Sequence, residues 1–350
     1  MTRIIKVDAE NPEIDKVRIA AEIISSGGLV AFPTETVYGL GADAFNEKAV
    51  LRVFKVKNRP PGNPLIVHIS DVKQLEMIVA EVPDIISTIA KIVWPGPLTF
   101  ILRKRKNVPD IVTGGLPNVA VRMPAHPVAL MLIKESTPIV GPSANVSGKP
   151  SPTSAKHVIE DLYGKIDVIL DAGETPLGIE STIVDMTTEP PVLIRPGPIT
   201  IEQLKEILRR EVKIHPGLLV TKEKVLDEKA PGLRYDHYTV KTKLILVEGD
   251  INKAVKRIKQ LVTKYVSEGK KLAILCTEET KSEYIELDAE LIVLGSRKNP
   301  FSVARNLFSK IRGLDDLNID IAIAEGYELK GLGFSIMYRL RNSAKEIIKA

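Results

Sequence analysis

The chain has 350 residues, of which 44% are hydrophobic and 27% are charged, and its formal net charge is +5. This length suits two domains, because single domains usually span about 100–200 residues. The sequence has no run near the roughly 18 apolar residues of a membrane span and no apolar signal-peptide core, and its single cysteine, Cys276, excludes internal disulfides and thiolate metal clusters. We therefore expect a soluble, cytoplasmic protein.

The surplus of positive charge lies in the C-terminal part of the chain. Residues 1–205 carry 22 Lys and Arg against 23 Asp and Glu. No basic run is interleaved with aromatic residues, as a surface for stacking nucleic-acid bases would require. The net charge therefore does not by itself indicate direct binding of tRNA.

The N-terminal part reads as a mixed α/β domain, assigned to residues 1–210. A helix is predicted with Asn11 as its N-cap and Gly27 as its stop, and further helices are predicted after Asn46, Ser70 and Thr153. Because strands and helices do not alternate strictly, a doubly wound sheet is not expected here. The apolar runs that predict strands are LVAFP, PLIVHI, PLTFIL, VAVRM, PIVG, DVIL and STIVD.

The remainder is predicted to form a linker and a second domain. Residues 211–241 show no lasting periodicity, so we assign them to an interdomain linker. From residue 242 to residue 350 the strand-like runs KLILVEGD, KKLAILC, LIVLG and DIAIAE alternate with predicted helices, the last of which is expected to run to Ala350. Regular alternation of this kind predicts a small Rossmann-like parallel α/β domain.

Two familiar nucleotide-binding motifs are matched only in part by this sequence. Gly39, Gly41 and Ala44 match G-x-G-x-x-A, but the acidic residue expected about 20 positions later is missing. Gly148 and Lys149 lack the upstream glycine of a P-loop. A bound nucleotide would have to be held by another arrangement.

A basic loop precedes one of the predicted strands. The segment KNRPPGNPLIVH places Lys57 and Arg59 two positions apart, just before a strand that carries His68 at its end. Two cations on a stiff loop repel each other unless an anion lies between them. The loop is interpreted either as a solvated surface or as a clamp for phosphate, and a lone histidine is more often an ordinary packed residue.

Hydroxyl and amide side chains gather in the loops of the same domain. Some of them can cap the helix that follows Thr153, but helix capping does not explain all of them. Arg122 is a charge at a strand end where the alternation would otherwise continue into an apolar position. The segments concerned are PTETVYGLG, GPSANVSGKPS, VAVRMP, ESTIVD and IRPG.

These segments, in this order and spacing, closely resemble the YrdC-domain family of threonylcarbamoyl-AMP synthases. The resemblance covers roughly residues 8–210 and implies a YrdC-like mixed twisted sheet. The longer form of the family adds a linker with a Tyr-x-His-Tyr element, matched here by residues 235–238, and a Rossmann-like C-terminal domain. The resemblance implies a nucleotidyltransferase that converts L-threonine, bicarbonate and ATP into threonylcarbamoyl-AMP and pyrophosphate. It also implies that the product passes to a separate tRNA-modifying complex.

The resemblance also implies roles for individual residues. Lys57 and Arg59 are expected to be catalytic, through charge stabilisation at the phosphates. Mg²⁺ is expected only with the phosphates of ATP, and no metal held by the protein is expected. The residues expected to bind ATP are Lys57, Arg59, Asn63, Ser143, Asn145, Ser151, Arg195 and Arg234, and those expected to bind threonine are Thr34, Thr36, His68, Arg122 and Ser181.

The linker is predicted to act as a lid. Its segment APGLRYDHY combines a Pro-Gly turn, a cation and tyrosines, which a passive tether would lack. Arg234 would reach the phosphates and Tyr235 would help to exclude water. The alternative is that the tyrosines only pack the two domains together.

Two other functions compete with that of the synthase. Enzymes that make carbamoyl-adenylate for hydrogenase maturation use the same domain, but they carry cysteine-rich zinc modules, which a single cysteine excludes. A binding module for double-stranded RNA would show steep salt dependence and no ATP turnover.

Overall fold

The structure is a computed structural model, and it describes residues 1–219 and 238–350. Arg234 and Tyr235 lie outside the described residues. The described chain divides into two compact units. The N-terminal unit holds residues 1–147, 151–176 and 180–219, and the C-terminal unit holds residues 238–350 with the short segments 148–150 and 177–179.

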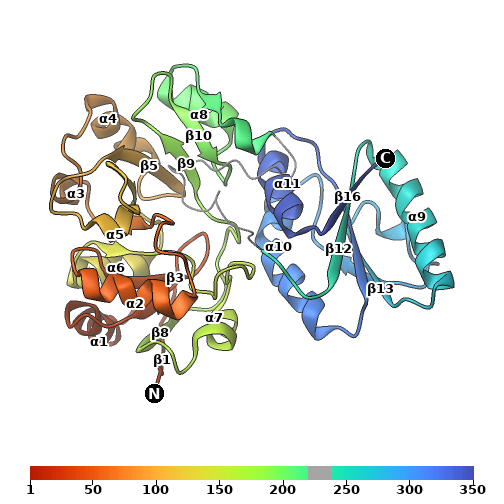
Figure 1. Ribbon diagram of the computed structural model, residues 1–350, viewed down its shortest axis with the longest axis horizontal. Coiled ribbons are helices and arrows are strands. Elements are labelled where there is room, and N and C mark those ends of the chain that lie inside the picture. The colour runs from red at the N-terminus through yellow and green to blue at the C-terminus, as the bar shows by residue number, and fades with distance from the viewer. Residues whose placement is uncertain (220–237) are drawn as a thin grey trace. The chain divides into compact units, whose positions relative to one another are not determined.

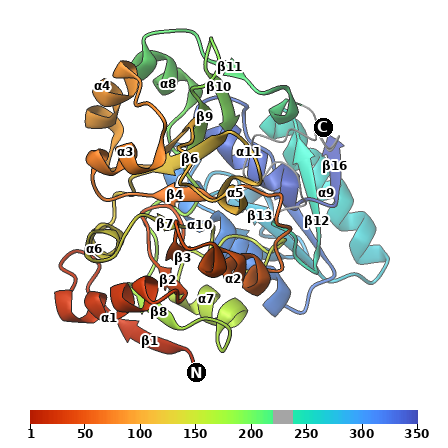
Figure 2. The ribbon, with the colours of Figure 1, turned by 60° about the vertical axis from the view of Figure 1, so that its left-hand side comes forward.

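The N-terminal unit is built on one mixed sheet of eleven strands. Their order is β1-β8-β2-β3-β7-β4-β6-β5-β9-β10-β11, and Figure 2 shows them stacked from β1 to β11. Pairs such as β4–β6 are parallel, whereas β2–β3 and β5–β6 are antiparallel, which confirms the mixed sheet. The strands are β1 (Arg3–Lys6), β2 (Val30–Phe32), β3 (Gly39–Asp43), β4 (Ile66–His68), β5 (Leu98–Arg103), β6 (Asn118–Arg122), β7 (Ile139–Val140), β8 (Val168–Asp171), β9 (Thr182–Asp185), β10 (Val192–Arg195) and β11 (Lys213–Ile214).

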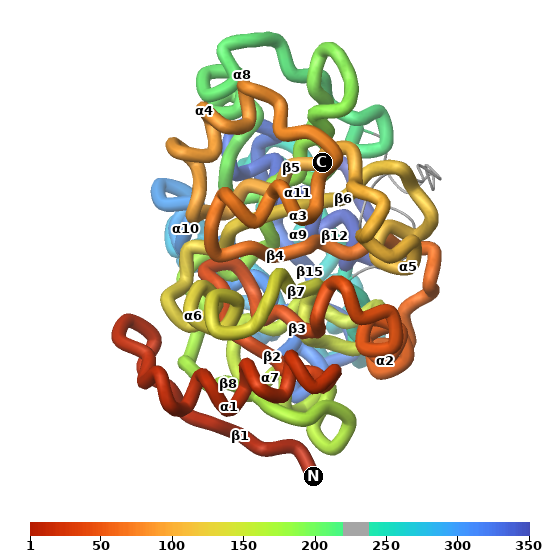
Figure 3. Tube along the Cα trace, turned by 90° about the vertical axis from the view of Figure 1, so that its left-hand side faces the viewer, coloured from red at the N-terminus to blue at the C-terminus, as the bar shows by residue number. Residues whose placement is uncertain are grey.

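Helices cover this sheet, and Figure 3 views the unit from the side that carries α1, α2 and α6. Helices α1 and α6 bury a shared core against β2 and β8, in which Val17, Ile24 and Leu132 are fully buried. The helices are α1 (Ile14–Ser25), α2 (Glu47–Lys57), α3 (Leu75–Ile78), α4 (Asp84–Val93), α5 (Asp110–Thr113), α6 (Pro127–Glu135), α7 (Ala155–Leu162) and α8 (Ile201–Leu208), with single 3₁₀ turns η1 (Val72–Gln74) and η2 (Pro216–Leu218).

The helix starts predicted after Asn46 and Thr153 were right, and the prediction at Asn11 was wrong. After Ser70 a 3₁₀ turn comes first and leads into α3. Asn46 caps α2, where its side chain accepts a hydrogen bond from the backbone N–H of Ala49 at 3.1 Å. Helix α1 begins at Ile14 with Glu13 as N-cap, so the prediction of Asn11 was wrong. The reason is local: the Asp8 carboxylate accepts the backbone N–H of Asn11 at 2.7 Å and holds that segment in a turn.

The C-terminal unit is an all-parallel sheet with helices on both faces, as expected for a Rossmann-like domain. Its strand order is β14-β13-β15-β12-β16. Figure 1 shows α9 on one face of this sheet and α10 and α11 on the other. The elements are β12 (Lys243–Glu248), α9 (Ile251–Ser267), β13 (Leu272–Cys276), η3 (Lys281–Glu283), β14 (Glu290–Val293), α10 (Pro300–Gly313), η4 (Leu314–Asp316), β15 (Ile321–Glu325), α11 (Leu332–Ser343) and β16 (Glu346–Lys349).

Two segments differ from the sequence prediction. The last helix ends at Ser343 instead of running to Ala350, because residues 346–349 form β16 and pair in parallel with β12. Within the segment assigned to a linker, β11 pairs with β10.

None of the helices in the described part of the chain combines the length and apolar character needed to cross a bilayer.

Candidate active site

The turn between β2 and β3 is organised by a threonine hydroxyl. The Thr34 hydroxyl donates to the carbonyl of Val37 at 2.6 Å and accepts the backbone N–H groups of Thr36 and Val37. It also lies 2.8 Å from the Thr36 hydroxyl. Both threonines are buried, so the turn PTETV is held in one conformation. Gly39 follows it, and a Cβ there would lie 2.8 Å from the Phe32 ring.

A buried ion pair joins this turn to the end of β6. The Arg122 guanidinium donates to the Thr36 hydroxyl at 2.9 Å and to the carbonyl of Gly96 at 3.2 Å. Its third nitrogen lies 2.7 Å from a carboxylate oxygen of Glu35, and the two side chains are only 4% and 8% exposed. A charge in such a position needs a partner, because an unpaired buried charge costs several kcal/mol. The sequence analysis gave Glu35 no role.

His68 lies beside Arg122, because β4 and β6 pair in parallel with these two residues in register. Burial lowers the pKa of His68 well below its ordinary value, and the nearby guanidiniums of Arg122 and Arg195 lower it further. The imidazole is therefore neutral near pH 7. Its Nδ1 is buried and has no hydrogen-bond partner among the described residues. It faces Gly141, where a Cβ would lie 2.5 Å away.

Ser181 and Arg195 meet at the start of β9 and the end of β10. The guanidinium of Arg195 donates to the Ser181 carbonyl at 3.0 Å and to its hydroxyl at 3.1 Å. The same hydroxyl lies 2.8 Å from that of Thr99 on β5. The sequence analysis placed Ser181 with threonine and Arg195 with ATP, and these two residues lie in direct contact.

The C-terminal end of α2 is tied to the loop after β7. Lys57 is only 1% exposed, and its ammonium donates to the carbonyls of Ser143 and, at 2.6 Å, of Asn145. The backbone N–H of Ser147 donates to the Lys57 carbonyl at 2.8 Å. Helix α2 ends directly afterwards, because Asn58 adopts the left-handed conformation. The structure thus brings together Lys57, Ser143 and Asn145, which are three of the residues expected to bind ATP.

Arg59 is half-buried and faces its own loop. Its guanidinium donates to the carbonyls of Asn63 at 3.2 Å and Pro64 at 2.9 Å. The loop is anchored by close backbone packing, since a Cβ at Gly114 would lie 2.8 Å from the carbonyl oxygen of Gly62. The hydrogen bonds described for Lys57 thus go to the loop after β7, and those described for Arg59 go to carbonyls of its own loop.

Ser151 forms a separate contact further along the chain. It is 2% exposed, and its hydroxyl donates to the carboxylate of Glu180 at 2.5 Å. Glu180 immediately precedes Ser181, so this contact ties Ser151 to the segment just before β9. The partners that the sequence analysis missed are Glu35, Thr99 and Glu180; a signal existed for Glu35, since a buried Arg122 requires a nearby anion.

The described residues of the chain contain no group of three or more His, Cys, Asp or Glu side chains that could hold a metal ion. The chemical groups described above are instead cations, hydroxyls, amides, one neutral imidazole and the carboxylates of Glu35 and Glu180, which pair with Arg122 and Ser151. Such a set can bind the phosphates of a nucleotide and the polar ends of an amino acid.

Family models match both units. A model described as "Telomere recombination" matches residues 22–197, and a model described as "Threonylcarbamoyl-AMP synthase, C-terminal domain" matches residues 199–345. Both matches together span most of the chain.

Curated relatives and a solved structure match over nearly the full length or all of it. The threonylcarbamoyl-AMP synthase of Pyrococcus abyssi is 49% identical over 100% of both chains, and that of Bacillus subtilis is 42% identical over 97% of this chain and 95% of its own. A crystal structure of P. abyssi Sua5 complexed with L-threonine superposes with a TM-score of 0.93 at 48% identity and covers 100% of both chains.

Proposed function

The chain belongs to the family of two-domain threonylcarbamoyl-AMP synthases, and we propose on this premise that its N-terminal unit makes threonylcarbamoyl-AMP. The threonine nitrogen bonds to the bicarbonate carbon and water is lost, which gives a carbamate. A carbamate oxygen then bonds to the α-phosphorus of ATP, and the bond from this phosphorus to the pyrophosphate breaks. The adenylate product supplies the threonylcarbamoyl group for tRNA modification.

The observation that carries the proposal is the buried polar cluster around Arg122. All residues of the expected threonine-binding set are buried, and they come from four segments of the chain: Thr34 and Thr36 in one turn, then His68, Arg122 and Ser181. Arg122 is the proposed partner of the threonine carboxylate. The neutral His68 offers its unbonded Nδ1 to a polar group of threonine, and the hydroxyls of Thr34, Thr36 and Ser181 offer further partners. The relative from P. abyssi, which was crystallised in complex with L-threonine, supports threonine as the amino acid that this site would bind.

The ATP phosphates are proposed to bind on the opposite side of the same site. Lys57 and Arg59 would place positive charge where negative charge develops, on the α-phosphate and the departing pyrophosphate, and Arg195 would add to it. Neutral donors and backbone groups near Asn63, Ser143, Asn145 and Ser151 would complete the phosphate site. No covalent intermediate on the protein is needed, because the carbamate is itself the nucleophile.

Arg195 connects the two halves of the proposed site. Its guanidinium already binds Ser181, so a phosphate on Arg195 and a threonine on Ser181 would lie next to each other. Such proximity lowers the barrier, since it brings the carbamate and the α-phosphorus together in one complex.

The proposal also covers a metal ion, a lid and the fate of the product. Mg²⁺ is proposed to arrive with the phosphates of ATP and to be held mainly by them. Arg234 and Tyr235 are proposed to form a lid over the adenylate. The product is proposed to pass, in the cytoplasm, to a separate tRNA-modifying complex.

The test is pyrophosphate release from ATP with each substrate omitted in turn. We expect release only when threonine, bicarbonate and ATP are all present. Release that persists without threonine or without bicarbonate would contradict the proposed reaction. A variant that replaces Lys57 with Met should lose activity while retaining threonine binding, because the proposed threonine side of the site is intact.

A further inference from the structure

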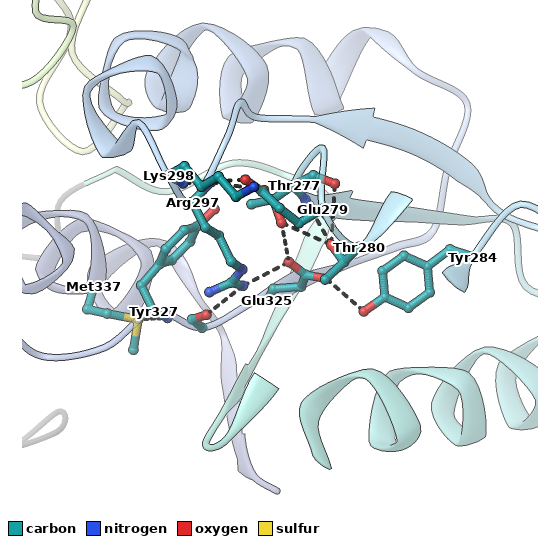
Figure 4. A network of polar contacts seen from close by, with 10 residues as sticks. Thr277, Glu279, Thr280, Tyr284, Arg297, Lys298, Glu325, Tyr327 and Met337 are labelled. Carbon is teal, nitrogen blue, oxygen red and sulfur yellow. Dashed lines mark hydrogen bonds and ion pairs between the residues drawn. The ribbon is translucent and has the colours of Figure 1, made fainter. Parts of the chain in front are cut away.

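The C-terminal unit contains a fully buried carboxylate at the end of β15. Glu325 is 0% exposed, and its oxygens accept hydrogen bonds from the Tyr284 hydroxyl at 2.8 Å and the Arg297 guanidinium at 2.9 Å. The Thr277 hydroxyl lies 3.4 Å from the same carboxylate, and that of Thr280 lies 3.0 Å from Thr277. Figure 4 shows these side chains converging on Glu325.

A buried ion pair of this kind is a poor way to stabilise a small domain. Apolar side chains of similar volume often stabilise a core as well or better, because burying two charges carries a large desolvation cost. The proposed synthase reaction uses none of these residues. Buried, coupled titratable groups are instead typical of binding and catalytic sites.

The position of the cluster in the sheet also indicates a binding site. Strand β13 leads to β14 at one edge of the sheet, whereas its neighbour β15 leads to β16 at the other edge. In open parallel sheets, ligands bind beyond the carboxyl ends of the strands where neighbouring connections diverge in this way. Thr277 directly follows β13, and Glu325 ends β15. The cluster therefore lies at the expected ligand position of this fold.

Two donors in the cluster have no partner. The Nε of Arg297 and the hydroxyl of Tyr327 are inaccessible to solvent and unbonded, and they are the two such side-chain atoms in the described part of the C-terminal unit. The guanidinium carbon of Arg297 lies 4.5 Å from the centre of the Tyr327 ring. Burial raises the pKa of the Tyr327 hydroxyl, so that it remains a proton donor.

The acceptors of the cluster, by contrast, are occupied. The carboxylate of Glu279 accepts the Ser296 hydroxyl at 2.5 Å and the backbone N–H groups of Arg297 at 2.9 Å and Lys298 at 3.3 Å. These hydrogen bonds outweigh the opposing effect of burial and hold the pKa of Glu279 at about 2. Unused donors beside occupied acceptors call for a ligand that accepts hydrogen bonds.

We propose that the C-terminal unit binds a small molecule bearing an oxyanion, either a phosphate or a carboxylate, between Arg297, Tyr327 and Lys298. Arginine presents a planar fork that matches such oxygens. Lys298 is exposed and follows Arg297 in the loop that leads into α10. The N-terminus of this 14-residue helix carries partial positive charge, which adds to the attraction.

The experiment must report on this cluster alone, because the proposed substrates of the N-terminal unit also carry phosphates and a carboxylate. Full-length protein is labelled with ¹³C at the ζ carbon of its tyrosines, and the signal of Tyr327 is identified by its loss in Tyr327→Phe. Inorganic phosphate, pyrophosphate and acetate are then titrated separately. We expect a saturable shift of the Tyr327 signal with the matching anion, while the signal of Tyr265 on α9 stays in place.

Variants separate binding from a merely structural role. Arg297→Lys keeps a positive charge beside Glu325 but loses the fork, so half-saturation should need roughly tenfold more anion. Lys298→Gln leaves the buried pair intact and should weaken binding about twofold to fivefold, whereas Lys264→Gln on α9 should change nothing. If no anion shifts the Tyr327 signal, or if Lys298→Gln and Lys264→Gln behave alike, the proposal is wrong. Both results are independent of synthase activity.

Discussion

Glu35→Gln tests whether the buried Arg122–Glu35 pair holds the proposed site together. The carboxylate oxygen lies 2.7 Å from the guanidinium nitrogen, and both side chains are almost fully buried. At an effective dielectric constant of about 20, the attraction is roughly 6 kcal/mol, and the desolvation of the two charges offsets part of it. Breaking a buried pair on one side costs about 3–5 kcal/mol. Because glutamine keeps an oxygen that can accept from Arg122, we expect a loss of about 3 kcal/mol in the free energy of unfolding.

The assay is urea unfolding followed by tryptophan fluorescence. Trp94 is the single tryptophan of the chain and is buried in the N-terminal unit, so its signal reports on that unit without interference from the other. Glu135→Gln is the matched control, because Glu135 pairs with Arg18 at 2.8 Å on the exposed surface. Exposed pairs contribute little, so this variant should unfold at nearly the wild-type urea concentration. Equal effects of the two substitutions would refute the reasoning.

Three further predictions concern the N-terminal unit, two at the proposed site and one at His126, the N-cap residue of α6. Arg59→Ala should lower the rate of pyrophosphate release by roughly 10² or more while the protein stays folded, and a near-normal rate would remove Arg59 from the phosphate site. L-Threonine should raise the melting temperature more than L-valine at equal concentration, because valine leaves the polar partners of the hydroxyl unpaired; equal shifts would remove hydroxyl recognition from the account. Burial lowers the pKa of His126 to about 4, so the unfolded chain takes up a proton first and stability should fall as the pH drops from about 6.5 toward 4. His126→Asn should flatten this pH dependence in urea unfolding, and an unchanged slope would contradict it.

Local signals in the sequence predicted most of the elements. Apolar runs bounded by proline and glycine marked the strands, and Asn46 marked the start of α2 because its side chain can cap a helix without help from the rest of the chain. The start of α1 was missed because Asp8, outside the periodic segment, takes the backbone N–H of Asn11. Strand β16 was missed because its pairing with β12 depends on residues about a hundred positions away.

The chemistry of the site was predictable only in part. Residue types and order pointed to Arg122, Lys57 and Ser181, but their partners are tertiary contacts. Thr36 and Arg122 are 86 positions apart, and Thr99 and Ser181 are 82 apart. No periodicity in the sequence brings such residues together, so the contact with Thr99 emerged only from the fold. An arginine at an apolar strand position called for a nearby anion, but only the fold identified that anion as Glu35. The buried cluster around Glu325 was not predicted from the sequence for the same reason, because its members lie at the ends of three different strands or just after them.

The most direct test of the central claim is the composition of the nucleotide product. The full-length protein is incubated with ATP, L-threonine and ¹³C-labelled bicarbonate. The nucleotides are then separated, and their masses are measured by mass spectrometry. We predict an adenylate that contains the threonine residue and one carbon from bicarbonate, released together with pyrophosphate. An adenylate without the labelled carbon, or ADP and phosphate as the products, would contradict the assignment of the site.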